Sequence, residues 1–199
     1  LTTSGYVVSF TPLSAEITLA TTTGRVIFVT QGAWGGDFKT AGSGTTGING
    51  ADNLCNSDLA KPATPIGATY KAMLVDGVNR RACTTTDCVT GGNSEHIDWV
   101  LSPNTTYLNN TNEVIAVTNS NAIWDFPTLH SIKAASPNVW TGFNTANRWV
   151  TGGDVCNLWT DATDNSGGRN GNPSVLDYTQ IGTNGSSCNV AQPLYCVQQ

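Results

Sequence analysis

Short apolar clusters between polar stretches rich in hydroxyl and amide side chains predict strands and turns more often than helices. The clearest strand is expected over residues 25–30, where β-branched and aromatic side chains lie between two turn-forming stretches. A second is expected over residues 69–75, which end at the turn dipeptide Asp76-Gly77. Residues 31–50 are rich in glycine and are expected to form a loop.

One segment, residues 49–60, has the periodicity of a helix. Asn49 is suited to cap its start, and Pro62 is expected to stop it. The face expected to be buried carries Leu54, Cys55 and Leu59, with Ala51 close by. The positions expected to face solvent are Asp52, Asn53, Asn56 and Asp58.

The rest of the chain has short apolar clusters separated by polar stretches, the longest of which runs from residue 161 to 187. The chain has no internal repeat and no change in amino-acid composition that would indicate a domain boundary. Residues 25–199 are therefore expected to form one domain, with residues 1–24 as an N-terminal extension, either an added strand or a linker.

Composition narrows the possible partners. The net charge is −5, and the nine lysines and arginines are scattered, with Arg80-Arg81 the sole adjacent pair. Nucleic acids and heparin-like polyanions need clustered cations, so neither is an expected partner. No apolar run is long enough to span a bilayer. An export signal or lipid anchor is expected to have been removed or to lie outside this sequence.

The six cysteines, an even number in a chain poor in lysine, indicate disulfides and an oxidising compartment. A zinc site would need C-x2-C pairs with histidine partners. The close pairs here are C-x4-C and C-x7-C, and neither His96 nor His130 lies near a cysteine. Cys83 and Cys88 bracket a short stretch and are expected to close a local loop.

The order of parts resembles the C-type-lectin-like fold: a strand, a helix carrying a cysteine, a strand, a long irregular middle, then W-T-G, C-x-x-W-T and C-x7-C. The resemblance implies an α+β domain of mixed antiparallel sheets, one or two helices and long loops. It also implies disulfides Cys55–Cys196 and Cys156–Cys188, and core positions for Trp140 and Trp159.

Several segments are closer to the endostatin-like branch of that fold, and to the leptospiral endostatin-like surface lipoproteins, a bacterial family of unknown function. The segments that carry this resemblance are residues 50–55, 70–74, 97–107, 114–127, 139–142, 157–160 and 188–197. Some family members attach to host matrix proteins or recruit complement regulators. The resemblance thus implies an adhesin-like binding module on the outer surface, with no cofactor and no binding residue carried over by a motif.

Two alternative functions to a protein-binding module remain, a glycan-binding module and a hydrolase. The Glu-Pro-Asn and Gln-Pro-Asp loops of calcium-dependent lectins are absent. Oxygen ligands for calcium would have to come from the late acidic stretch, where a solvated loop is the simpler interpretation. The candidate ligands are Asp154, Asp161, Asp164 and Asn165, with Asp177 as a further one.

Sequence motifs of hydrolases are also absent, since the chain has no G-x-S-x-G and no H-E-x-x-H. A dispersed Ser-His-Asp triad cannot be judged from sequence. The zinc site of endostatin depends on N-terminal histidines, which this chain lacks. A non-enzymatic binding module is therefore expected.

Contact residues for a protein ligand are expected in the stretch 161–187, which the bridge between Cys156 and Cys188 would hold at both ends. Arg169 and Tyr178 in this stretch belong to residue types enriched at interfaces. Trp34, in the glycine-rich loop, is either a further contact or a plug against the core. Three N-x-S/T sequons begin at Asn104, Asn109 and Asn184.

Overall fold

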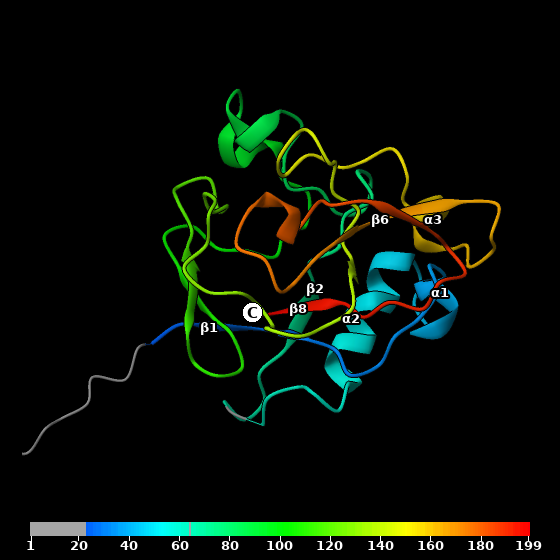
Figure 1. Ribbon diagram of the computed structural model, residues 1–199, viewed down its shortest axis with the longest axis horizontal. Helices are drawn as coiled ribbons and strands as arrows, with labels where there is room; N and C mark the ends of the chain where they lie inside the picture. The colour runs from blue at the N-terminus through cyan, green and yellow to red at the C-terminus, as the bar shows by residue number, and fades with distance from the viewer. Residues whose placement is uncertain (1–22, 64) are drawn as a thin grey trace, which may run out of the picture.

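The computed structural model describes residues 23–63 and 65–199, so that nearly all of the expected extension 1–24 lies outside the described residues. Within them the chain forms an α+β fold of mixed sheets, short helices and long connections, as expected (Figure 1). The elements in chain order are β1 (Arg25–Val29), α1 (Phe38–Ala41), α2 (Gly47–Ser57), β2 (Tyr70–Ala72), η1 (Thr86–Cys88), η2 (Gly92–Glu95), β3 (Thr106–Leu108), β4 (Val114–Val117), β5 (Val139–Trp140), α3 (Cys156–Trp159), β6 (Gly167–Gly171), η3 (Tyr178–Gln180), β7 (Gly185–Ser187) and β8 (Tyr195–Gln198).

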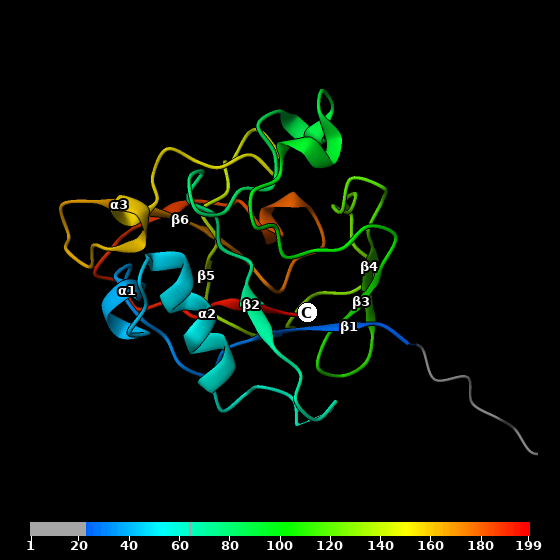
Figure 2. The same ribbon diagram turned by 180° about the vertical axis from the view of Figure 1, so that it is seen from behind.

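The main sheet has five strands in the order β2-β8-β1-β3-β4, so β1 is its central strand. β1 runs antiparallel to β8 and parallel to β3, and Figure 2 shows β3 and β4 on one side of it with α2 on the other. The pairing with β8 joins Ile27, Phe28 and Val29 to their partners, whereas the pairing with β3 involves only Arg25 and Val26. A smaller sheet has the order β5-β6-β7.

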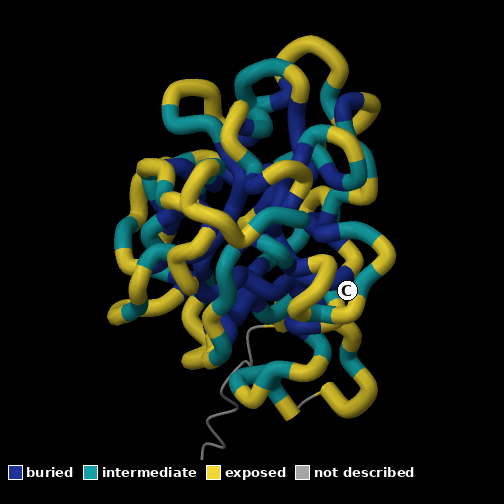
Figure 3. Tube along the Cα trace, turned by 90° about the vertical axis from the view of Figure 1, so that its right-hand side faces the viewer, coloured by how far each residue is buried: buried dark blue, intermediate teal, exposed yellow. Residues whose placement is uncertain are grey.

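Two hydrophobic clusters pack on the two faces of the main sheet. Successive side chains of a strand point to opposite faces, and accordingly Ile27 and Val29 belong to one cluster and Phe28 to the other. Trp140 and Trp159 are completely buried in the second cluster, which confirms their expected place in the core. Exposed positions are concentrated on the peripheral loops around this interior (Figure 3).

Three disulfides connect elements that are far apart in the sequence or close one local loop. Cys55–Cys196 joins α2 to β8, Cys156–Cys188 joins α3 to the segment after β7, and Cys83–Cys88 closes the loop around η1. These are the pairings that the resemblance and the local spacing implied.

The helix differs from its expected bounds at both ends. It begins at Gly47 rather than Asn49, because the Thr46 side chain accepts from the Asn49 amide, 3.1 Å away. It ends at Ser57, and Leu59, expected on the buried face, is 86% exposed. The helix stops there because Asp58, its C-cap in an extended conformation, turns its carboxylate to distant backbone amides.

Asp52 was expected to face solvent, and the structure shows instead that it is partly buried. Its Oδ1 accepts from the Ala72 amide at 2.8 Å and forms an ion pair with the fully buried Arg80, also at 2.8 Å. Helical periodicity could not reveal this contact, because both partners lie outside the helix.

The remaining differences concern irregular segments. The strand expected over residues 69–75 is regular only over Tyr70–Ala72, although Met73 still donates its amide to Tyr195. The glycine-rich stretch 31–50 contains α1 and the start of α2 rather than a continuous loop. The late stretch 161–187 contains β6, η3 and β7, so much of it is hydrogen-bonded structure.

Candidate binding groove

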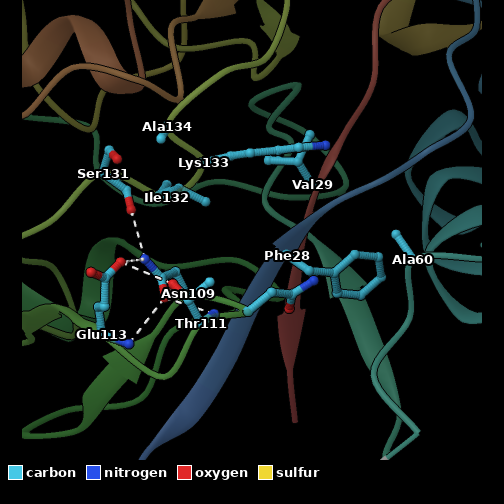
Figure 4. Close-up of a pocket in the computed structure, with 11 residues that line it drawn as sticks. Phe28, Val29, Ala60, Asn109, Thr111, Glu113, Ser131, Ile132, Lys133 and Ala134 are labelled. Atoms are coloured by element: carbon cyan, nitrogen blue, oxygen red, sulfur yellow. Dashed lines mark hydrogen bonds between the residues drawn. The ribbon is translucent and has the colours of Figure 1, made fainter.

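A groove follows the length of β1 and consists of three adjoining hollows. The largest of the three is the central hollow, of about 420 Å³, which shares Ala60 and Lys133 with a second hollow of about 330 Å³. It shares Asn109 and Asn110 with a third of about 250 Å³. The β1 residues that line them are Val26, Phe28 and Val29, and Thr30, which follows the strand, lines the second hollow. Figure 4 shows the central hollow.

One wall of the groove is the connection between α2 and β2. Asp58 fixes its start to the end of β1, accepting from the amides of Gln31 at 2.9 Å and Gly32 at 3.0 Å. The wall itself is formed by Ala60 and Pro62. The same connection carries Leu59 and Ile66, which are 86% and 94% exposed, so it presents apolar side chains to solvent beside the groove.

The opposite wall is formed by the β3–β4 turn and by residues 131–137. Asn109 joins the two segments, because its Nδ2 donates to the Ser131 carbonyl at 3.2 Å and to Glu113 Oε2 at 2.8 Å. Its Oδ1 accepts from the amides of Thr111 and Glu113, both at 3.0 Å (Figure 4). The side-chain amide of Asn109 is thus fully engaged, and its hydrogen bonds fix this wall.

Two charged side chains line the central hollow. The pKa of Glu113 lies below its usual range because Asn109 and Thr111 donate hydrogen bonds to the carboxylate, so Glu113 is ionised at neutral pH. Lys133 lies where the first two hollows meet, and its backbone is fixed by a 3.1 Å hydrogen bond to the Pro173 carbonyl. Its side chain forms no ion pair with any described residue.

Two of the late acidic residues, Asp154 and Asp161, are engaged by protein donors. Asp154 pairs with Arg169 at 2.7 Å, and Asp161 accepts from the Thr163 amide at 2.8 Å and from the Ser166 hydroxyl. Among the described residues, the His, Cys, Asp and Glu side chains that approach closely enough to share a metal ion are Cys83, Cys88 and Glu95, and both of those cysteines are in a disulfide. The carboxylates among the candidate calcium ligands do not form such a group, although Asp154 and Asn165 both line a separate hollow of about 370 Å³.

The structure places the three expected contact residues apart from the groove. Arg169 lies on β6 in its ion pair with Asp154, and Tyr178, 37% exposed, begins η3. Trp34 is partly buried against the second core cluster, and its carbonyl accepts from the Trp140 indole at 2.9 Å. Trp34 thus packs against the core with part of its surface accessible, and its contact with a ligand stays a prediction.

Neither histidine lines the groove. His96 donates from Nε2 to the Asn121 carbonyl at 3.0 Å and stacks on Trp99, and its burial lowers its pKa. His130 donates from Nδ1 to the Val114 carbonyl at 2.8 Å. Both rings are thus held by backbone carbonyls.

The sequence predicted none of the groove residues as a ligand contact, although Asn109 begins a sequon. They come from five separate segments, around residues 26–33, 60–62, 109–113, 131–137 and 193. The run Asn109-Asn110-Thr111-Asn112 has the composition of a turn, which was the available signal, but nothing local indicates that this turn faces β1.

Fold and site together define a class, a disulfide-bonded α+β domain that presents a groove beside the central strand of its main sheet. The chain belongs to a family described as proteins of unknown function (DUF1554), whose model matches residues 38–175. This range contains both walls of the groove, whereas β1 precedes it. No curated protein matches the chain. Among the described residues, no helix is long and apolar enough to cross a membrane.

Proposed function

We propose that this chain is an extracellular binding module with a C-type-lectin-like fold of the endostatin-like branch, and that it attaches to a protein ligand through the groove along β1. The order of elements and the nested bridges Cys55–Cys196 and Cys156–Cys188 support the fold. Three disulfides in one domain support an oxidising, extracellular location.

The groove itself is the observation that carries the proposal. Its walls are held by the carboxylate of Asp58 and the amide of Asn109, so the site exists before a ligand binds and little ordering is needed. Its lining combines apolar side chains with a few polar groups, as is typical of recognition sites. Exposed apolar residues beside it, Leu59 and Ile66, extend the surface that a partner can cover.

A protein ligand fits this site better than a glycan. Sugar-binding sites offer an exposed aromatic face beside converging polar groups, but the aromatic residue in the groove is Phe28, whose side chain is buried. Four of the six tryptophans are fully buried, and the other two, Trp34 and Trp99, are packed against the core. The described surface thus lacks a tryptophan platform for stacking.

By its resemblance to the leptospiral endostatin-like surface proteins, the ligand belongs to host matrix proteins or serum complement regulators, and a lipid anchor upstream would hold the module on the outer surface. In this role the chain acts by adhesion rather than by catalysis. Glu113, the carboxylate of the central hollow, is held ionised by hydrogen bonds from Asn109 and Thr111.

The test is retention of serum and matrix proteins on the immobilised chain, with and without chelator. In Ala134→Arg a long side chain enters the central hollow, and we expect the retained protein to dissociate. Ala135→Arg adds the same charge one residue further on, at an exposed position that does not line the groove, and should retain it.

A third variant, Arg169→Ala with Tyr178→Ala, tests whether the ligand binds to the stretch 161–187 instead. If this variant loses the ligand while Ala134→Arg keeps it, the groove is not the binding site. Loss of binding with chelator would instead place the glycan-binding hypothesis first.

A further inference from the structure

We infer that the groove receives an extended peptide segment of the partner, which adds to the main sheet as a strand beside β1 and places an acidic side chain against Lys133. The inference rests on the proposed function and specifies the chemistry that its site recognises.

The first observation is a stretch on one edge of β1 that no described strand pairs, at the bottom of the groove, where Val29 is 3% exposed. Thr30 donates its amide to the Leu194 carbonyl of the segment leading into β8, so by strand alternation the peptide groups of Val29 point the other way. On that side β3 pairs only with Arg25 and Val26. Among the described strands, none continues β3 alongside Val29, and unpaired strand edges of this kind accept added strands.

The second observation is that the groove occupies the place that a continued β3 would fill. The chain leaves β3 after Leu108, and Asn109 begins the turn that forms one wall of the central hollow. Val29 lines that same hollow. A strand entering the groove would therefore run between the Asn109 wall and the open edge of β1.

The size of the groove matches a short peptide. Its lining follows β1 from Val26 to Thr30. At about 3.3 Å per residue, this length corresponds to an extended segment of about five or six residues. Side chains of such a segment alternate in direction, so every second one can contact the apolar wall residues Ala60 and Ile132.

Charge specifies one position of the peptide. Lys133 is exposed where two hollows meet and has no ionic partner among the described residues. In Figure 4 the Lys133 side chain points away from Glu113, whose carboxylate accepts from Asn109 and Thr111. An aspartate or glutamate of the peptide would neutralise the free cation, which favours acidic segments over basic ones.

A second copy of this chain is a poorer occupant. Each copy carries a net charge of −5, so two copies repel one another.

The experiment selects heptapeptides from a random phage-displayed library on the immobilised full chain. Peptides are kept whose binding is lost in Ala134→Arg and retained in Ala135→Arg. We expect them to alternate apolar side chains and to share an acidic position. Synthetic copies are then N-methylated one amide at a time, because methylation removes the donor that strand pairing needs.

Methylation of every second amide should weaken binding about tenfold, and methylation of the intervening amides should change it little. Lys133→Glu should reverse the preference at the acidic position, from glutamate to lysine, by about tenfold. Uniform effects along the peptide, or an unchanged preference in Lys133→Glu, would overturn the inference. Dimerisation of the chain through the groove, detected by ultracentrifugation and abolished by Ala134→Arg, would overturn it as well.

The two proposals fail separately. If the serum or matrix ligand depends on the groove but no alternation appears on methylation, the proposed function stands and strand addition is wrong. If no natural ligand depends on the groove, the proposed function is wrong whatever the peptides do.

Discussion

Glu95 is a buried carboxylate that organises the loop closed by Cys83–Cys88. It accepts hydrogen bonds from the amides of Thr84, Thr85 and Gly91 and from the hydroxyls of both threonines. Burial by itself would raise the pKa of Glu95, but these hydrogen bonds favour the charged form more strongly, and its pKa lies well below the usual range. The carboxylate therefore stabilises the loop as an ion.

This depressed pKa gives stability a defined pH dependence. The contribution of Glu95 is fully present above the pKa of the unfolded chain, about 4.3, and is lost as the pH falls toward the lower pKa of the folded state. We expect Glu95→Gln to flatten the fall in stability between about pH 5 and pH 2, measured by urea unfolding. Asp164→Asn, at an exposed position, should leave the fall unchanged. Parallel curves for wild type and Glu95→Gln would contradict this role.

The late acids lead to a prediction about calcium. Asp154 is paired with Arg169, and the pKa of Asp161 is lowered because Ser166 and the Thr163 amide donate to it. Protein donors already occupy oxygens that a calcium ion would need. Calorimetry should detect no calcium site of about micromolar affinity or tighter. Detection of such a site would favour the glycan-binding hypothesis.

At the scale of elements, α1 and α2 pack closely because glycines lie at their contact. A Cβ on Gly50 would stand 2.0 Å from the Phe38 carbonyl oxygen, and a Cβ on Gly42 would stand 2.0 Å from the carbonyl oxygen of Gly50. No side chain fits at either position. The two glycines thus explain why a short helix forms inside a stretch whose composition indicates a loop.

Gly50→Ala sets two effects against each other. Alanine gains about 1 kcal/mol of helix propensity over glycine, but overpacking costs about 1–3 kcal/mol. Because the clash is with backbone, which cannot swing aside, we expect a net loss of about 1–2 kcal/mol in the free energy of unfolding. Gly153→Ala is the control, since a Cβ there meets nothing within 4 Å. A neutral or stabilising Gly50→Ala would show that α1 moves away freely.

At the scale of the whole molecule, the three disulfides restrain loops of very different length. Their sequence separations are 141 residues for Cys55–Cys196, 32 for Cys156–Cys188 and 5 for Cys83–Cys88. The chain-entropy estimate gives about 5, 4 and 2 kcal/mol of stabilisation for these bridges. The outermost bridge also joins α2 to β8, so it fastens the helix to the strand that pairs with β1.

Replacing each bridge by a pair of alanines should therefore lower the melting temperature in that order, most for Cys55→Ala with Cys196→Ala and least for Cys83→Ala with Cys88→Ala. The measurement is thermal unfolding of the three double variants under oxidising conditions. A larger loss for the local bridge than for the outermost one would mean that its loop, with the buried Glu95, contributes more than chain entropy accounts for.

What the sequence by itself determined depends on short-range pattern. The run of β-branched and aromatic side chains in residues 25–30 predicted β1, the periodicity near Leu54 predicted α2, and an even number of cysteines indicated disulfides. In such cases propensity and hydrophobic pattern act over a few neighbouring residues. The pairing of the long bridges came from a family resemblance, since spacing alone leaves several connectivities open.

Only the tertiary structure decided where α2 ends, where Asp52 points and where the groove lies. Asp58 ends the helix by binding amides 26 and 27 residues away, and Asn109 orders its wall by binding Ser131, 22 residues away. The open edge beside Val29 exists because β3 stops after Leu108. Each of these features depends on a contact between distant segments, and a local pattern carries no information about which distant segment will face it.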